Sequence, residues 1–439
     1  MIPSKYNIII RDFPEQRQLL VYNTLRESMV VVDDAIEDIF MSGRTPRELD
    51  PEGLDALVRE GFVYEQEGYE KNLVQYLFAS RKYSKKAVET VIMTTEACNL
   101  RCKYCLEGEL IAPRSMDEQT AHNVAQQLIE RLKAHGTKRL TLDFFGGEPL
   151  LNTTPIAVIA PKLREYCAKN EVYLHIRVTT NGTLLDYECY RLLRRLSVDK
   201  IQVTIDGPKD VHDYRKPPID GGSSFQSIID NLQHCDNEHP KLQIRLNIDA
   251  HNVARINEIL HYLASTVKGF INQVPSVYVA PTELAFCPSE NWNRYVFSPA
   301  EKATAMVKIW GQMAELGLPV AHLPTYYPCG VLTDWATVVG VSGELYCCTA
   351  LAGIREFQRG DLSNEDAQPT GVHLEFLTTD VWNQCLHCMF LPLCGGGCRV
   401  QSLIRTGNAF NLDCQREFFE GALETYIKAN YLAECRTEI

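Results

Sequence analysis

The sequence predicts an α/β protein in which a partial (β/α)6 barrel is preceded by a small winged-helix-like module and followed by a cysteine-rich C-terminal domain. Between Glu89 and about Ala280, strand-like runs alternate with amphipathic runs, the pattern of a parallel sheet with crossover helices. Roughly six such β/α units are too few to close the usual eight-stranded barrel, so an open barrel is expected. With 439 residues, of which 45% are hydrophobic, the chain is long enough for two or three domains.

Composition and periodicity divide the chain into four parts without low-complexity stretches or obvious tandem repeats. These are the winged-helix-like module at 1–70, a linker at 71–88, the partial barrel at 89–318 and the cysteine-rich domain at 319–439. The barrel strands are expected near Val91, Leu140, Leu174, Ile201, Ile244 and Val277. Function in such sheets gathers at the C-terminal ends of the strands and in the loops that follow them.

The N-terminal module is predicted from short strand-like runs and two helix-like patterns. The strands are expected at Tyr6 to Ile10, Leu19 to Leu25 and Met29 to Val32, and the helices begin near Asp33 and near Pro51. Winged-helix modules often bind DNA, but residues 1–70 hold 7 basic and 15 acidic residues, a net charge of −8, which disfavours a phosphate-facing surface. An exposed edge strand is suited instead to an extended peptide docking by β-augmentation, and the alternative is a structural cap on the barrel.

Charge and hydropathy disfavour several classes of partner. The whole chain carries a formal charge of −12, which argues against nucleic acid or an anionic membrane. No apolar stretch approaches the roughly 18 residues of a spanning helix, and Met1 to Phe13 lacks the apolar core of a signal peptide. We therefore expect a cytoplasmic enzyme whose 16 cysteines are reduced, with the clustered ones serving as metal ligands.

Three cysteines directly after the first barrel strand form the most informative motif in the chain. Cys98, Cys102 and Cys105 have Cys-x3-Cys-x2-Cys spacing and offer a soft metal centre three ligands without a fourth. Because Fe–S clusters are usually closed by four cysteines, a three-cysteine loop leaves one iron able to bind something other than protein. The alternatives are chance spacing and a partial zinc knuckle.

Three further motifs follow later strands of the predicted barrel. Gly146, Gly147 and Glu148 follow the second strand, where paired glycines let a ligand approach the backbone and a carboxylate accepts hydrogen bonds from an ammonium group. Asn181, after the third strand, is placed to meet a ribose hydroxyl, and Arg215, after the fourth, to clamp a carboxylate in bidentate fashion. Each motif has a purely structural alternative: a tight turn for the paired glycines, an Asn-Gly turn for Asn181 and a solvated loop arginine for Arg215.

Together these motifs resemble the radical S-adenosylmethionine (SAM) enzymes: the cysteine loop, Gly-Gly-Glu-Pro, Thr-Asn-Gly, and Asp-Gly-Pro with His-Asp-x-Arg, over about 89–280. The resemblance implies that the three cysteines bind a 4Fe-4S cluster whose open iron takes SAM. It further implies that Tyr104 packs near the adenine and that Glu148, with the paired glycines before it, holds the methionyl amino group. By the same resemblance, Arg215 binds the SAM carboxylate and Asn181 the ribose.

The C-terminal third carries a second cysteine pattern. It consists of Cys329, a Gly-x4-Cys element ending at Cys348, a Cys-x2-Cys-x5-Cys-x3-Cys run and a final Cys414. Seven thiols exceed one zinc site and fall one short of two zinc-ribbon-like sites, so a two-zinc protein is the alternative. The arrangement is similar to the SPASM extension of radical SAM enzymes over about 319–439. By that resemblance, two auxiliary 4Fe-4S clusters are held by Cys329, Cys348 and Cys398, and by Cys385, Cys388, Cys394 and Cys414.

Two departures from the family pattern bear on function. Some relatives carry a further cysteine where this chain has Leu323, so the first auxiliary cluster either has an open iron or takes Cys287 or Cys347 as its fourth ligand. Sulfatase-maturing members typically place an aspartate, their catalytic base, where this chain has Thr349. The missing base and the additional N-terminal module favour enzymes that modify a ribosomally made precursor peptide, in which a leader segment docks on a winged-helix module.

The expected activity is that of a peptide-modifying oxidoreductase. The resemblance implies that an electron from a donor such as flavodoxin or ferredoxin enters the first of three 4Fe-4S clusters, and that SAM yields a 5′-deoxyadenosyl radical. That radical takes hydrogen from the precursor peptide, and closure on a cysteine sulfur or another side chain gives a thioether or carbon crosslink. Two alternatives stay open: a sulfatase-maturing type of dehydrogenase acting on a protein Cys or Ser, and a non-catalytic metal-binding protein that docks peptides.

Overall fold

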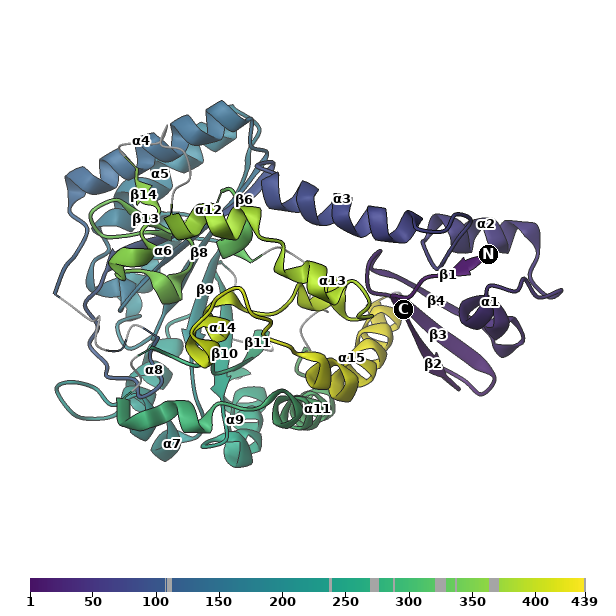
Figure 1. The fold of residues 1–439 in the computed structure, drawn as a ribbon. Helices are drawn as coiled ribbons and strands as arrows, with labels where there is room; N and C mark the ends of the chain where they lie inside the picture. The colour runs from purple at the N-terminus through teal and green to yellow at the C-terminus, as the bar shows by residue number, and fades with distance from the viewer. Residues whose placement is uncertain are drawn as a thin grey trace.

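The computed structural model shows a central α/β domain, a small N-terminal module and a C-terminal region that reaches from one to the other (Figure 1). The structure describes residues 1–106, 108, 113–236, 239–268, 276–286, 289–319, 329–335, 338–362 and 371–437. In these ranges no helix combines the length and the apolar character that a membrane span requires.

A nine-stranded sheet forms the centre of the molecule, in the order β11-β10-β9-β8-β7-β6-β12-β13-β14. The strands from β6 to β11 are parallel neighbours in chain order. They are β6 (Ala87–Thr95), β7 (Arg139–Gly146), β8 (Tyr173–Thr180), β9 (Lys200–Thr204), β10 (Lys241–Ile248) and β11 (Ser276–Pro281). Each contains a position where the sequence predicts a strand. The predicted α/β fold around a parallel sheet is therefore confirmed.

Helices connect the parallel strands and bury the apolar face of the sheet. They are α4 (Glu118–His135), α5 (Thr154–Lys169), α6 (Tyr187–Arg195), α7 (Lys209–Arg215), α8 (Ser224–Leu232), α9 (Ile256–Tyr262) and α11 (Pro299–Glu315). Alternation along each strand separates the two faces, because successive side chains point to opposite sides. In β10, Leu242, Ile244 and Leu246 join this apolar core, whereas Gln243 and Arg245 line a cavity on the other face.

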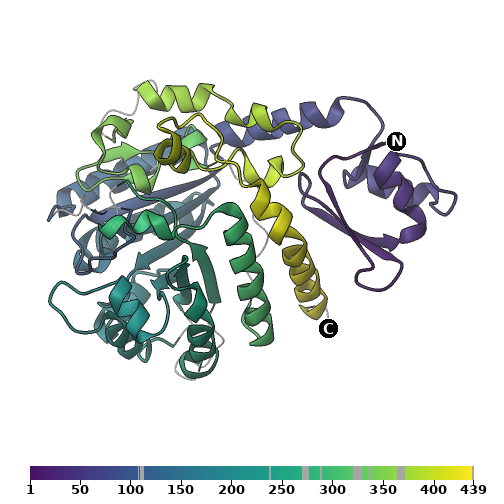
Figure 2. The same cartoon turned by 60° about the horizontal axis from the view of Figure 1, so that its bottom comes forward.

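Three short C-terminal strands continue the same sheet: β12 (Val338–Val339), β13 (Glu344–Tyr346) and β14 (Gly360–Asp361). Strand β12 pairs in parallel with β6, so the sheet crosses the predicted boundary between residues 318 and 319. The C-terminal helices are α12 (Gly371–Thr378), α13 (Leu391–Cys394), α14 (Arg399–Thr406) and α15 (Arg416–Thr437). Helix α15 lies beside α11, as Figure 2 shows.

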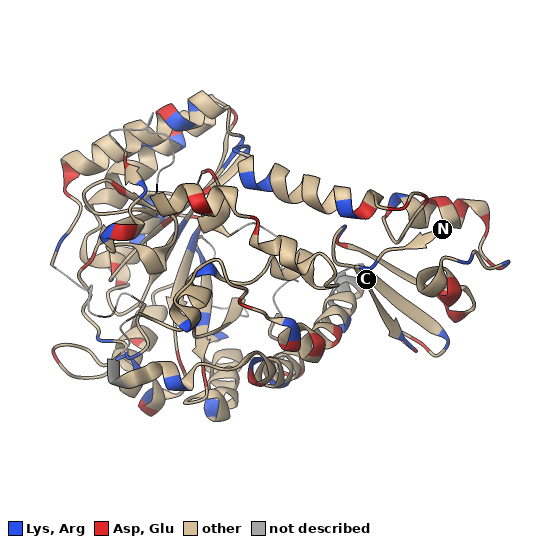
Figure 3. Cartoon of the chain, viewed as in Figure 1, with Lys and Arg blue, Asp and Glu red and all other residues tan. Residues whose placement is uncertain are grey.

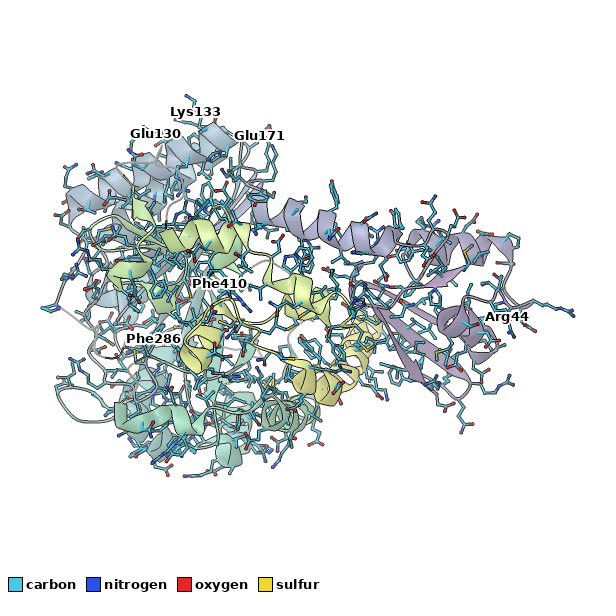
Figure 4. All side chains as sticks on the ribbon, viewed as in Figure 1. Arg44, Glu130, Lys133, Glu171, Phe286 and Phe410 are labelled. Carbon is cyan, nitrogen blue, oxygen red and sulfur yellow. The ribbon has the colours of Figure 1, made fainter. Side chains whose placement is uncertain are left out.

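The N-terminal module contains an antiparallel sheet in the order β2-β3-β4 and a short β1-β5 pair. Its elements are β1 (Ile2–Pro3), β2 (Asn7–Arg11), β3 (Gln18–Asn23), β4 (Ser28–Asp33), α1 (Glu37–Ser42), α2 (Pro51–Arg59) and β5 (Val63–Tyr64). Helix α3 (Tyr69–Tyr83) then occupies most of the predicted linker 71–88. Positions of acidic residues on the module are red on the ribbon in Figure 3, and the Arg44 side chain points outward from it in Figure 4.

The module is packed directly onto the C-terminal region. Ile10 and Tyr22, from its sheet, share an apolar cluster with Phe419 and Ile427 of α15. Phe78 of α3 contacts Trp382 edge to face, with ring centroids 4.8 Å apart. The two ends of the chain therefore share buried apolar surface, which fixes the position of the module relative to the central domain.

Candidate functional site

A cavity of about 680 Å³ opens on the inner face of the parallel sheet. Its wall takes side chains from all six parallel strands, among them Val91, Asp143, Thr179, Gln202, Arg245 and Tyr278. A sheet that contributes one face to a single cavity from its first strand to its sixth must curve around that cavity. Cys98, Cys102 and Cys105 lie in the same wall, after the carboxyl end of β6.

The cysteine loop is held by the chain segment that follows α7. The backbone N–H of Arg101 donates to the carbonyl of Pro217 at 2.9 Å, and that of Ile219 donates to the carbonyl of Asn99 at 3.1 Å. These bonds satisfy backbone groups of an irregular loop that would otherwise be open to water. They also fix the direction in which the three thiols face the cavity.

The surroundings of these thiols suit a metal centre. Burial raises the pKa of Cys98 to about 11 and also raises that of Cys102, and the neighbouring thiol of Cys105 adds to both shifts. The positive charge of Lys216 opposes these shifts. A buried thiol with a raised pKa is protonated at neutral pH unless a metal binds it and displaces the proton. These three thiols are therefore better suited to bind a metal cluster than to act as free thiolates.

The paired glycines at the end of β7 allow close backbone packing against the cysteine loop. Gly146 has φ = +132°, and a Cβ atom there would lie 2.1 Å from the carbonyl oxygen of Thr95. A Cβ atom on Gly147 would lie 2.3 Å from the carbonyl oxygen of Ala97. Because the N–H of Gly147 also donates to Thr95 at 3.0 Å, the glycines connect β7 to the residues just before Cys98.

Glu148 is fully buried and does not line the cavity, although Gly146 and Gly147 do. Its carboxylate accepts hydrogen bonds from the hydroxyl of Thr180 at 2.6 Å and from the backbone N–H of Asn181 at 2.7 Å. Burial raises its pKa, and these hydrogen bonds oppose the shift. Through these bonds the carboxylate joins the end of β7 to the end of β8, and its contact with the methionyl amino group stays a prediction.

Tyr104 and Asn181 both lie on the cavity wall. The Tyr104 hydroxyl accepts a hydrogen bond from Asn247 Nδ2 of β10 at 3.0 Å. Asn181 Nδ2 donates to Asn99 Oδ1 at 2.9 Å and lies 4.0 Å from Cys98 Sγ. Each side chain thus ties the cysteine loop to a strand of the sheet.

Arg215, predicted to bind the SAM carboxylate, is fully buried and is absent from the cavity wall. Its guanidinium pairs with Asp249 at 2.7 Å and with Asp206 at 3.4 Å. The guanidinium carbon Cζ of Arg215 lies 4.8 Å from the ring centroid of Tyr104 and 5.3 Å from that of Trp292. Arg215 neutralises buried carboxylates beneath the cysteine loop.

Lys216, the next residue, does line the cavity, with only 3% of its surface exposed. Its ammonium group forms no hydrogen bond or ion pair with a residue that the structure describes. Its charge acts on Cys98, Cys102 and Glu148, which places it beside the cysteine loop. An ammonium so placed is available to an anionic group in the cavity.

Sequence reasoning missed the polar lining of the cavity, although the strands carried a signal for it. Polar residues recur at every second position of β10, at Gln243, Arg245 and Asn247, between the apolar residues of the core. The interior of a solid barrel is instead filled mainly by bulky branched residues. The alternation therefore indicates a hollow, polar interior.

The C-terminal cysteines form two groups in the structure. Cys348 and Cys398 pack in one apolar cluster with the buried Cys347, and Cys329 acts electrostatically on all three. Thr349, next to Cys348, lines the large cavity, so this first group adjoins it. Leu323 and Cys287, the other positions considered for its fourth ligand, lie outside the described residues.

The second group lines a small apolar cavity of its own. Its members are Cys385, Cys388, Cys394 and Cys414. Phe390, Leu391 and Phe419 complete much of the wall, so the cavity side of the group is apolar, although Cys414 itself is exposed. In the described ranges no three His, Cys, Asp or Glu side chains converge closely enough to hold a single metal ion.

Arg399 lies buried beside the four-cysteine group, with 1% of its surface exposed. Its guanidinium donates to backbone carbonyls, including those of Gly396, Gly397 and Ala409, and it forms no ion pair within the described part of the chain. The positive charge acts on Cys398, Cys329 and Cys394. A buried cation without a carboxylate partner fits an anionic centre nearby.

Comparison with known protein families identifies the kind of domain that surrounds the large cavity. Residues 92–263, which contain the cysteine loop and β7 to β10, match the family model of the Radical SAM superfamily. This chain carries a radical SAM domain. The match implies a 4Fe-4S cluster and SAM at the cavity, and the three thiols and the Lys216 ammonium in its wall are donor types that fit this pair.

Two relatives show how much of the chain the sequence similarity covers. The chain is 22% identical over 367 residues to a cysteine-type anaerobic sulfatase-maturating enzyme of Clostridium perfringens, a match that covers 76% of this chain and 95% of that protein. It is 27% identical over 160 residues to the radical SAM cyclopropyl synthase TigE of Paramaledivibacter caminithermalis, covering 34% of this chain and 32% of TigE.

Solved structures share the fold at low sequence identity. Native anSMEcpe with bound AdoMet has a TM-score of 0.59 at 19% identity and covers 78% of this chain and 100% of that chain. Streptococcus suis SuiB bound to S-adenosylmethionine has a TM-score of 0.55 at 14% identity and covers 94% of this chain and 98% of that chain. The SuiB fold therefore spans more of this chain than the radical SAM domain alone.

Proposed function

We propose that this protein is a peptide-modifying radical SAM enzyme that oxidatively installs a thioether or carbon crosslink in a ribosomally synthesised precursor peptide. One observation carries the proposal: the N-terminal module is built onto the C-terminal cysteine region. A structure of SuiB bound to its precursor peptide SuiA covers 94% of this chain, whereas the anSMEcpe structures cover 78–79%. The larger coverage supports the peptide-modifying class over the sulfatase-maturating class.

In this proposal Cys98, Cys102 and Cys105 hold the 4Fe-4S cluster. When bound, the cluster and SAM together supply a 5′-deoxyadenosyl radical that removes a hydrogen atom from an unactivated carbon. Lys216 binds the SAM carboxylate in place of Arg215, supported by its place on the cavity wall. Tyr104 and Asn181 keep their proposed contacts with adenine and ribose.

The cavity then receives one segment of the substrate. Its volume of about 680 Å³ lies in the range of ligand pockets, which is enough for SAM and a side chain but not for a folded domain. Arg245 Nε donates to Asn247 Oδ1 at 2.8 Å, and the guanidinium forms no ion pair within the described ranges. The wall thus favours a polar or anionic substrate group.

The two C-terminal cysteine groups hold auxiliary 4Fe-4S clusters that accept the electron released when the crosslink closes. Thr349 places the first group beside the cavity, and Cys347 is a candidate for its fourth ligand. The leader segment docks by β-augmentation on β4, one of the two edge strands of the N-terminal sheet. Flavodoxin or ferredoxin supplies the electron for SAM cleavage.

Anaerobic reconstitution tests the proposal. The loaded protein with a reductant should convert SAM to 5′-deoxyadenosine, and co-expression with a short peptide encoded next to it should lower the peptide mass by two hydrogens per link. Protein that binds iron but leaves SAM intact would support a non-catalytic metal-binding protein instead. Zinc in the cysteine loop would contradict the radical mechanism.

A sulfatase-maturating type of dehydrogenation is the second candidate. Thr349 stands where such enzymes place a catalytic aspartate, but Glu283 on the same cavity wall offers a carboxylate that can act as the base instead. Burial by the surrounding protein raises the pKa of Glu283, as expected for a base. A sulfatase peptide with a reactive cysteine should then be oxidised, and Glu283→Gln should slow the reaction. Thr349→Val serves as the control from the same wall.

A further inference from the structure

The Tyr6 hydroxyl, in the N-terminal module, is a buried donor without an acceptor. The side chain is completely buried, and its oxygen has no hydrogen-bond partner in the described structure. Buried polar groups are nearly always paired, since leaving one unpaired forfeits its bonds to water. Tyr6 is therefore either a defect or a group whose partner binds later.

Glu70, the carboxylate that acts on the Tyr6 pKa, forms no hydrogen bond with its hydroxyl. Glu70 accepts from the hydroxyl of Ser4 and from the backbone N–H of Lys5. On its other side Tyr6 packs in one apolar cluster with Trp382, Leu391 and Cys385 of the C-terminal region. The Tyr6 side chain therefore crosses the interface to the four-cysteine group.

On the C-terminal side, the sulfurs of Cys385 and Cys388 are acceptors without a donor among the described residues. Backbone N–H groups of Gly396 and Gln415 donate to the Cys394 sulfur, whereas no donor to the Cys388 sulfur occurs in the described ranges. Burial, Glu70 and Cys388, in that order, raise the pKa of Tyr6. The hydroxyl thus remains protonated and lies within electrostatic range of Cys388.

We propose that the Tyr6 hydroxyl is the hydrogen-bond donor to the iron–sulfur centre of the four-cysteine group, on the side of Cys385 and Cys388, and that the N-terminal module is therefore part of that centre. The inference rests on the proposed function only in requiring a cluster at these four cysteines. Hydrogen bonds to the sulfurs of a cluster stabilise its reduced, more negative state and so raise its reduction potential.

The position of Tyr6 gives this bond a regulatory consequence. Tyr6 directly precedes β2, in the sheet proposed to receive the leader peptide. Docking of an extended peptide on that sheet and the redox state of the centre are then linked through one side chain. Such linkage is reciprocal, so reduction of the centre also alters peptide affinity.

Tyr6→Phe tests the proposal, because it removes only the hydroxyl. Tyr64→Phe is the matched control: Tyr64 is in the same module, is buried and has an unpartnered hydroxyl, but its electrostatic neighbours are Glu70, Arg26 and Tyr69. Both variants and the wild type are reconstituted with iron and sulfide, and redox titration is followed by electron paramagnetic resonance. Tyr6→Phe should lower the midpoint potential of one auxiliary cluster, and Tyr64→Phe should leave all potentials unchanged.

The other outcomes separate the inference from the proposed function. Equal iron content with unchanged potentials in Tyr6→Phe overturns the inference and leaves the proposed function intact. About four irons per wild-type chain, the content of one cluster, shows that the auxiliary clusters themselves are absent and overturns both. In metal-free protein, Tyr6→Phe should not lower the melting temperature, and a clear decrease would reveal a protein acceptor and contradict the inference.

Discussion

The three-cysteine group and the four-cysteine group present the same ligand atom in opposite surroundings. The first lies in the wall of a large polar cavity, with Lys216 and Asn181 beside it and a buried layer of charged side chains beneath. The second lines a small cavity closed by Phe390, Leu391 and Phe419, under the N-terminal module. The first arrangement leaves room for a charged molecule beside the thiols, whereas the second sets its thiols against a mainly apolar wall.

The contrast shows how cysteine thiols in one protein can serve two tasks, a centre open to SAM and a centre enclosed by apolar side chains. A centre that must bind SAM needs polar groups and space, and an apolar shell around a cluster controls solvent access and potential. The charged layer under the first group depends on paired ions, and the shell of the second depends on apolar packing. The two regions should therefore respond differently to mutation and to pH.

Removal of one cysteine from each group should produce the largest contrast. Cys102→Ala should reduce 5′-deoxyadenosine formation to background, because the cluster that binds SAM loses one of three ligands. Cys388→Ala should retain SAM cleavage and lose crosslinked product. Both are measured by chromatography of the nucleoside and mass spectrometry of the peptide. Equal loss of SAM cleavage in both variants would contradict the division of tasks.

Loss of the buried cation beneath the first group should destabilise the fold. Arg215→Gln leaves Asp206 and Asp249 without their partner, and breaking a buried ion pair from one side costs about 3–5 kcal/mol. Denaturant unfolding of the metal-free protein checks this value. Arg245→Gln is the control, because Arg245 forms no ion pair in the described ranges. A stable Arg215→Gln with weakened SAM binding would restore the original role of Arg215.

Lys216→Gln should weaken SAM binding with little effect on stability. A charge-assisted hydrogen bond contributes about 1.5–3 kcal/mol, which corresponds to roughly a 10- to 100-fold rise in Kd. Titration of the oxidised cluster with SAM, which leaves SAM uncleaved, followed by the cluster spectrum, measures the affinity. Lys209→Gln, an exposed lysine of α7, should leave the Kd unchanged. An unchanged Kd in Lys216→Gln would exclude the proposed carboxylate contact.

Mild acid should weaken the charged layer before the apolar shell. His212 is completely buried, and burial lowers its pKa to about 3. Because its unfolded pKa is near 6.5, the unfolded chain binds a proton below that pH while the native chain does not, and stability falls as pH decreases from 6.5 toward 3. Between pH 7 and 5 the loss is about 2 kcal/mol. Comparing His212→Gln with the wild type at both pH values in unfolding experiments should show a smaller difference in the variant.

The sequence predicted the positions of the six parallel strands, because hydrophobic alternation and length are local properties of a strand. It also identified the cysteine loop, whose three ligands lie within eight residues and so reach a common wall in the fold. The extension of the sheet by β12 to β14 was missed. These strands are two or three residues long and acquire their place because β12 pairs with β6, from a distant part of the chain, while β13 pairs with β12 and β14 with β13.

Arg215 and Lys216 show why the site was harder to predict than the fold. Both are basic and adjacent, and the sequence does not distinguish which one faces the cavity. Helix α7 ends at Arg215, so its side chain points into the buried carboxylates, while Lys216 leaves the helix with φ = −129° and ψ = 60° and reaches the cavity wall. Local pattern therefore determined which residue types meet at this end of the sheet. The end of α7, which is fixed by tertiary packing, decided that Lys216 and not Arg215 faces the cavity.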